Sequence, residues 1–302
     1  DDKLNNIKID CVLDAKANLG EGAIWSVKDQ MLYWVDINKG LLCKFNPENG
    51  KNISFDFEKP IGCFALKSNL NVILALTDGF FEFDQIKKTK ILIDNTESDI
   101  LENRFNDGTV DYNGRFYAGT MAINGSNINE SAKGSLYCLE PSGRVNKTMG
   151  GFYTVNGLAF SPDYKTAYVS DSAYWIRTIW AYDYDLIDGI WSNKRTFFDT
   201  KNVAGRPDGG CIDADGCYWM AGVSGWELLR ITPQGKVDMT IKMPIEKPTK
   251  IAFGGSKLDT IYVTSIGQEN ITKGTEKQQP NAGGLFAFYI PGVKGIQFPC
   301  YG

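Results

Sequence analysis

EGAIWSVKDQMLYWVD, residues 21–36, holds the pattern on which the fold assignment depends. An apolar segment leads into a polar turn, and an aromatic-rich segment follows, which is the pattern of a β-hairpin. The same pattern recurs five more times along the chain, at residues 62–76, 106–120, 156–171, 208–222 and 249–265. Six copies of one hairpin across 302 residues indicate a repeat fold.

Further strand-like segments follow each hairpin. GLLCKFNPENG (40–50) alternates apolar with polar residues and ends in a turn, and KNISFDF (51–57) reads as a fourth, outer strand. Four strands per repeat, at a period of roughly 40–50 residues, predict an all-β fold, a six-bladed β-propeller with four antiparallel strands per blade. An early strand, IKIDCVLD (7–14), is left over and is expected to complete the last blade, so that residues 1–302 form one domain. Six hairpins argue against both a sandwich and a seven-bladed ring.

Composition narrows the functional classes. The net charge of −4 argues against a general nucleic-acid binder, and no apolar run approaches the roughly 18 residues of a membrane span. The start DDKLNN shows no signal peptide, so a cytoplasmic location is expected, although the missing initiator Met leaves a processed N-terminus open. The odd count of seven cysteines, mostly in apolar runs, favours buried free thiols in a reducing compartment.

The chain contains no histidine. This excludes Ser-His-Asp and Cys-His catalysis and also His-ligated zinc or copper. Hydrolytic chemistry in this protein must therefore use carboxylates, amides, Lys, Arg, hydroxyls, thiols or an oxygen-bound metal.

Aligning the six repeats predicts which side chains meet in the central channel. The last apolar residues of the opening strands coincide at Trp25, Leu66, Val110, Phe160, Ile212 and Phe253. Four positions earlier stand Glu21, Gly62, Asn106, Asn156, Asp208 and Thr249. Because the opening strand of each blade lines the channel, the four acidic and amide side chains of this set should converge at one height.

Such a convergence has two interpretations. A divalent cation satisfies carboxylates and amides together, and all-oxygen ligation favours Ca²⁺, Mg²⁺ or Mn²⁺, although Fe²⁺ and Zn²⁺ also accept carboxylates. The alternative is that these side chains bind ordered water near the axis. Arg104 and Asp107 flank Asn106 in ENRFNDG (102–108), where they either join the site or serve as a surface charge and a turn cap.

Six motifs in order resemble one known family. They are LGEGAIW (19–25), NRFNDGTVDYNGRFYAGTM (103–121), VNGLAFSPD (155–163), GRPDGGCIDADGCYW (205–219), IAFGG with LDTIYVTS (251–265) and AGGLFAFYIPGVKG (282–295). Together they make essentially the whole chain similar to the regucalcin/gluconolactonase/luciferin-regenerating-enzyme family. The resemblance is strongest to the bacterial gluconolactonase, xylonolactonase and arabinonolactonase type.

The resemblance implies a propeller that binds one divalent metal ion and hydrolyses sugar-acid lactones. Carried over by position, the metal ligands are Glu21, Asn156 and Asp208, and the substrate contacts are Arg104 and Asn106.

The chain also departs from the family pattern at three positions. Asn124 stands where some animal members carry a substrate-binding Glu and is therefore a third candidate substrate contact, and Ala23 replaces the Pro of the GEGP motif. Arg206 stands where many relatives have an aromatic residue before PDG, so it either alters substrate choice or pairs with a neighbouring acid.

The resulting hypothesis is metal-dependent hydrolysis of an aldonolactone, with a small sugar lactone as the only expected partner. Asp208 is the general-base candidate, and direct activation of the water by the metal ion (Ca, Mg, Mn, Fe or Zn) is the variant. The main alternative is a non-enzymatic propeller that binds calcium or a protein partner, and another esterase activity is a third. The Arg104–Asn106 pair favours an enzyme, because a structural ion does not require it.

Overall fold

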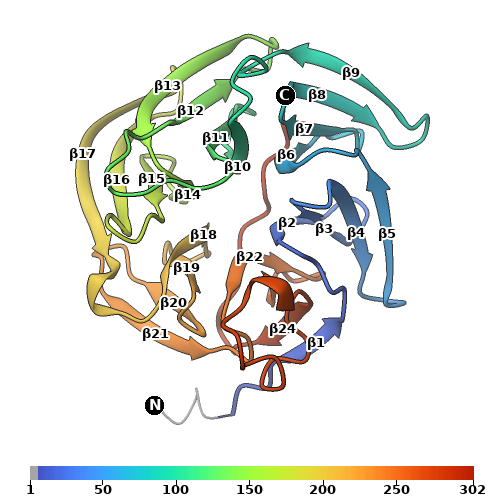
Figure 1. The fold of residues 1–302 in the computed structure, drawn as a ribbon, viewed down its shortest axis with the longest axis vertical. Helices are drawn as coiled ribbons and strands as arrows, with labels where there is room; N and C mark the ends of the chain where they lie inside the picture. Colours follow the sequence, from blue (N-terminus) through green and yellow to red (C-terminus); the bar gives the residue numbers. More distant parts are fainter. Residues whose placement is uncertain (1–5) are drawn as a thin grey trace.

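Six antiparallel sheets of four strands surround a central channel in the computed structural model, which describes residues 6–302 (Figure 1). The predicted all-β, six-bladed propeller is thereby confirmed. Residues 1–5, with which the predicted domain and the DDKLNN start begin, lie outside the described residues. Among residues 6–302, no helix is both long and apolar enough to cross a bilayer.

In the first five blades, the strands follow one another in chain order from the channel outwards. The first blade comprises β2 (Gly20–Ser26), β3 (Met31–Asp36), β4 (Leu41–Asn46) and β5 (Lys51–Asp56). The second comprises β6 (Ile61–Leu66), β7 (Val72–Leu76), β8 (Gly79–Asp84) and β9 (Thr89–Asp94). The third comprises β10 (Asn103–Val110), β11 (Phe116–Ala122), β12 (Gly134–Leu139) and β13 (Val145–Phe152).

The fourth blade comprises β14 (Val155–Phe160), β15 (Thr166–Asp171), β16 (Thr178–Asp185) and β17 (Ile190–Asp199). The fifth comprises β18 (Arg206–Ile212), β19 (Tyr218–Val223), β20 (Glu227–Ile231) and β21 (Val237–Lys242). The sixth comprises β22 (Pro248–Gly254), β23 (Thr260–Ser265), β24 (Leu285–Tyr289) and, outermost, β1 (Asp10–Leu13). Two three-residue 3-10 helices, η1 (Thr200–Asn202) and η2 (Gln268–Asn270), lie in loops.

The last blade combines a strand from the beginning of the described chain with three strands from its later part. β1 pairs antiparallel with β24, with Asp10 opposite Ala287 and Leu13 opposite Leu285. This pairing places residues from the start of the chain in the same sheet as β22–β24, so the ring is closed by hydrogen bonds between strands distant in sequence.

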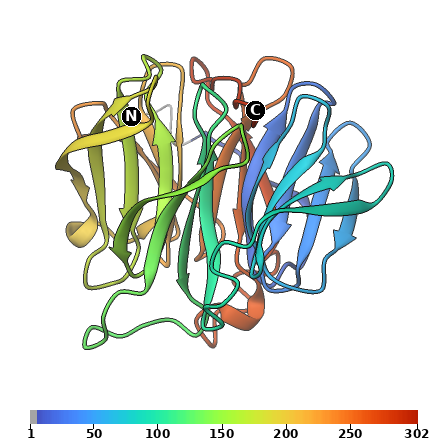
Figure 2. The ribbon, with the colours of Figure 1, turned by 90° about the horizontal axis from the view of Figure 1, so that it is seen from above.

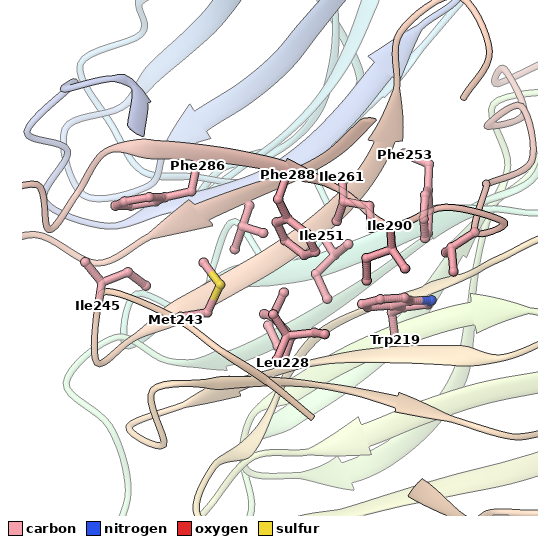
Figure 3. Close-up of a cluster of buried hydrophobic side chains, with 14 of the residues drawn as sticks. Trp219, Leu228, Met243, Ile245, Ile251, Phe253, Ile261, Phe286, Phe288 and Ile290 are labelled. Atoms are coloured by element: carbon pink, nitrogen blue, oxygen red, sulfur yellow. The ribbon is translucent and has the colours of Figure 1, made fainter. Parts of the chain in front are cut away.

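Hydrophobic side chains between neighbouring blades form the core. Figure 3 shows the cluster between the fifth and sixth blades, where Trp219 and Leu228 face Ile251, Phe253 and other residues of the sixth blade. Inner strands such as β2 and β22 are buried along their whole length, whereas the outermost strand of the first blade, β5, is mostly exposed. Burial therefore falls from the axis outwards, and polar groups on the inner strands are removed from water.

The C-terminal segment, residues 290–302, crosses one end of the channel (Figure 1). The backbone N–H of Tyr301 donates to the carbonyl of Leu66, and that of Gly302 donates to Gly114. Ile296 and Phe298 line a cavity in the channel together with the later residues of the inner strands. Figure 2 shows this segment at one end of the ring and the loop that carries η2 at the other. The inner strands therefore begin at the end that the segment leaves uncovered, and we call this the open end.

The segment should contribute to stability through its anchor, Tyr301. This side chain is 6% exposed, and its hydroxyl donates to the carbonyl of Glu140. We expect Tyr301→Ala to lower the free energy of unfolding by about 3 kcal/mol, because it removes a buried aromatic ring. Tyr289→Ala is the matched control, since Tyr289 is 54% exposed, and should cost less than about 0.5 kcal/mol. Equal urea-unfolding midpoints for the two variants would show that the segment is only loosely attached.

Candidate functional site

Every inner strand carries a pairing irregularity near the open end. The register shifts lie between Glu21 and Ile24, Ile61 and Cys63, Phe105 and Gly108, Asn156 and Ala159, Pro207 and Gly210, and Pro248 and Lys250. A β-bulge redirects side chains at the point where it interrupts the ladder. Gly22 and Gly157 adopt φ values of +68° and +63°, which explains the glycines after Glu21 and Asn156.

The bulges bring the aligned side chains of four blades together in buried positions. Glu21, Asn106, Asn156 and Asp208 are each less than a tenth exposed. The Glu21 and Asp208 carboxyl groups lie near each other, since Asp208 raises the pKa of Glu21. The amide nitrogen of Asn106 donates to the carbonyl of Val155 in the next blade, at 2.8 Å.

The other two aligned positions serve packing between blades. A Cβ atom on Gly62 would lie 2.2 Å from the backbone of Phe105, so only glycine fits there. The hydroxyl of Thr249 donates to the carbonyl of Gly20, which links the sixth blade to the first. Neither residue adds a charged group to the site.

Two buried oxygen atoms in the site have no hydrogen-bond donor among the described residues. They are Oδ1 of Asn156 and Oδ1 of Asp208. The amide nitrogen of Asn156 donates to the hydroxyl of Ser172 at 3.0 Å, and the amide oxygen is the atom left without a partner among the described residues. A buried acceptor without a donor costs about 1–3 kcal/mol, so these two atoms are available either to a cation or to an ordered water molecule.

Asn106 differs from Asn156 in this respect. Its Oδ1 accepts a hydrogen bond from Nη1 of Arg104 at 3.0 Å, and the same Nη1 donates to the carbonyl of Phe105 at 2.9 Å. Both polar ends of the Asn106 amide are therefore occupied. The hydrogen bonds thus divide the four converging side chains into three with available oxygen atoms and one that supports Arg104.

The charges at the site are poorly balanced. Burial, and then the neighbouring Asp208, raise the pKa of Glu21 well above its usual value. Burial raises the pKa of Asp208 to about 6, with Asp107 contributing. Burial also raises the pKa of Asp107, but Lys250 and the backbone N–H groups of Gly108 and Gly157 oppose that rise. Arg206 opposes the rise at Asp208, but neither Glu21 nor Asp208 forms an ion pair among the described residues.

The residues present fit a divalent cation. Glu21, Asn156 and Asp208 supply only oxygen atoms, which is the donor chemistry of hard cations. Among residues 6–302, no three His, Cys, Asp or Glu side chains are grouped closely enough to hold a metal ion. A site at this position consequently needs the amide oxygen of Asn156 as its third protein donor.

The remaining candidate residues lie at different depths. Arg104 is buried, and burial lowers its pKa to about 10 while Glu21 and Asp208 oppose that shift. Asn124 lies on an exposed turn after β11, and no hydrogen bond among the described residues joins it to the site. Its proposed substrate contact stays a prediction.

Sequence reasoning missed two residues at the site, and the structure shows two aspartates near it acting as backbone caps. Ser172 positions Asn156, and Lys250 is a buried ammonium that donates to the carbonyl of Gly210 at 2.6 Å. Neither stands in a motif that signals such a role. Asp107 accepts from the N–H groups of Gly108 and Gly157, and Asp171 accepts from those of Tyr153, Thr154 and Ala173, so both cap backbone.

Comparison with known proteins identifies the family of the chain. Residues 19–267 match the family described as the SMP-30/Gluconolactonase/LRE-like region. The chain belongs to this family. It is 37% identical to regucalcin from Xenopus laevis, over 97% of this chain and 98% of that protein. It is 35% identical to 6-deoxy-6-sulfogluconolactonase from Pseudomonas putida, over 98% of this chain and 99% of that protein.

Solved structures of SMP-30/gluconolactonase/LRE-like proteins share the fold. The calcium-binding protein regucalcin from Agrobacterium tumefaciens superposes with a TM-score of 0.91 at 25% identity, covering 98% of each chain. A luciferin-regenerating enzyme gives a TM-score of 0.90 at 28% identity, covering 98% of this chain and 99% of that one. The family resemblance seen in the sequence motifs is confirmed.

Asp208→Asn should stabilise the metal-free protein at pH 7.5. The folded pKa of Asp208, about 6, lies above its ordinary value of 3.8, so stability is lost as the pH rises through about 6. Removing this buried charge should raise the free energy of unfolding by about 1–3 kcal/mol at pH 7.5, with a smaller gain at pH 4.5. Urea unfolding of chelated protein measures this difference. Asp183→Asn, at an exposed ion pair, is the control and should change little. A less stable Asp208→Asn variant at pH 7.5 would contradict the charge imbalance.

Proposed function

We propose that the protein opens sugar-acid lactones by hydrolysis and uses one divalent metal ion held by Glu21, Asn156 and Asp208. The observation that carries the proposal is the pair of buried acceptors without donors, Oδ1 of Asn156 and Oδ1 of Asp208, beside a second carboxyl group. Family membership supports lactone hydrolysis in general. The relative from Pseudomonas putida is named as a lactonase, and the solved Agrobacterium relative is described as calcium-binding.

The bound ion would supply Lewis-acid chemistry, polarising the ester carbonyl and stabilising the negative charge that develops on its oxygen. The protein holds the three donors on separate blades, in bulged and buried strands, so their positions are set before substrate arrives. This preorganisation is the part of the chemistry that the fold itself provides.

Asp208 is the residue we assign to proton transfer. Water attacks the carbonyl carbon, the ring C–O bond breaks, and a proton from the water ends on the released hydroxyl group. A carboxylate can carry that proton, and burial makes Asp208 more basic than an exposed Asp. A bound cation lowers that basicity, so the two effects oppose each other.

Arg104 and Asn106 would orient the substrate. Both hydrogen bonds of Arg104 use Nη1, which leaves Nε and Nη2 as donors for sugar hydroxyl groups. Asn106 and the carbonyl of Phe105 fix the guanidinium, so little side-chain freedom is lost when substrate binds. A purely structural ion has no need of this arrangement, which is why we favour an enzyme over a calcium-binding propeller.

Asp208→Ala should lower kcat/KM for aldonolactones by at least about 1,000-fold, because it removes both a metal ligand and the proposed base. A pH-stat assay on pentono- and hexonolactones measures the loss, and far-UV circular dichroism verifies the fold. Asp183→Ala is the matched control and should retain wild-type turnover, because Asp183 lies on β16 in an exposed ion pair. Full activity in Asp208→Ala would refute the assignment.

Chelation should stop lactone turnover, and adding back one divalent ion per chain should restore it. The melting temperature should fall only by the amount that ion binding contributes at the concentration used. A metal series on the chelated protein ranks the ions by kcat/KM. Undiminished turnover after complete removal of metal would overturn the metal-dependent mechanism, and ion-dependent stability without any turnover would favour the non-enzymatic alternative.

A further inference from the structure

Arg206 lies beside the proposed metal ligands without taking part in their hydrogen bonds. It is the first residue of β18, two positions before Asp208. Its Nη1 donates to the carbonyl of Ser172 at 3.4 Å, and the hydroxyl of that same Ser172 receives the Asn156 amide. Ser172 thus connects the Arg206 guanidinium to Asn156, a proposed metal ligand.

The guanidinium of Arg206 has no carboxylate partner. Arg115 and Arg230, also withdrawn from water, pair with two and three carboxylates respectively. No ion pair within the described part of the chain includes Arg206, and its single hydrogen bond is long. Asp208 is the nearby acid that raises the pKa of Arg206, and it is already assigned to the cation. A half-buried guanidinium without an ion pair has donors available to an anionic group.

Arg177 holds the backbone segment that precedes Arg206. Its Nε donates to Thr200 at 2.8 Å, and its Nη2 donates to the carbonyls of Val203 and Gly205 at 3.0 and 2.9 Å. These bonds hold the segment that leads directly into Arg206. Arg177 also adds a second positive charge nearby, since it lowers the pKa of Arg206.

We propose that Arg206 binds a second anionic group on the lactone, so that the preferred substrates are acidic sugar lactones rather than neutral ones. This inference rests on the proposed function. The group is a carboxylate, a sulfonate or a phosphate, separate from the ester that is hydrolysed. A planar guanidinium with unused donors is suited to all three, because it can donate two parallel hydrogen bonds to two oxygen atoms of one group.

The test compares lactones that share one carbon skeleton. Gluconolactone is the neutral probe, and the acidic probes are glucarolactone, 6-phosphogluconolactone and 6-deoxy-6-sulfogluconolactone. The metal-loaded wild type is assayed with Arg206→Gln, Arg206→Lys and the control Arg195→Gln, which alters an exposed arginine on β17. Calorimetric binding of gluconate and of glucarate to the same proteins gives a readout that does not need turnover.

The wild type should prefer at least one acidic lactone, and the strongest preference identifies the group. Arg206→Gln should lower kcat/KM for that lactone by about 10- to 100-fold and change the neutral lactone by less than about threefold. Arg206→Lys should recover part of the loss, Arg195→Gln should match the wild type, and glucarate should lose its binding advantage in Arg206→Gln.

Three results would overturn the inference: no preference for any acidic lactone, equal losses on neutral and acidic lactones, or retained tight glucarate binding in Arg206→Gln. If no lactone is hydrolysed at all, the proposed function fails. The glucarate comparison then still decides whether Arg206 is an anion site.

Discussion

Two carboxyl groups that are distant in sequence, Glu21 and Asp208, are buried together where the inner strands of the ring converge. Burying like charges opposes folding, and the opposition is increased by acceptor atoms of Asn156 and Asp208 that have no donor. The hydrophobic contacts between blades must outweigh this cost. Under the proposed function a bound cation would remove this cost, so the atoms that oppose folding would also be the ones that bind the ion.

The geometry of the site is a property of the closed ring. Asn106 contacts the next blade through Val155, Asp107 does so through Gly157, and Thr249 joins the sixth blade to the first. Each proposed ligand comes from a different inner strand, so its position depends on how the blades pack. The pairing of β1 with β24 and the C-terminal segment at the far end hold that packing in place.

Repetition made much of this structure predictable. Six hairpins give the blades, and their alignment selects Glu21, Asn106, Asn156 and Asp208, all four of which are buried on inner strands. Alignment cannot separate Asn106 from Asn156, because that difference lies in hydrogen bonds to Arg104 and Ser172. The C-terminal segment was not predicted, since it belongs to no repeat and is held by isolated backbone contacts. Asn124 was carried over from relatives into a loop, where positions are least transferable.

Negatively and positively charged side chains lie next to each other at this site. Glu21, Asn156 and Asp208 form the proposed ion-binding part, and Arg104 and Arg206 supply positive charge beside it. The proposed ion-binding role depends on a single divalent ion occupying the axis. A crystal structure of the protein loaded with Mn²⁺, with the anomalous signal of the ion recorded, tests this directly. We predict one strong peak in contact with Glu21, Oδ1 of Asn156 and Asp208. A peak elsewhere, or none at saturating Mn²⁺, would contradict the assignment.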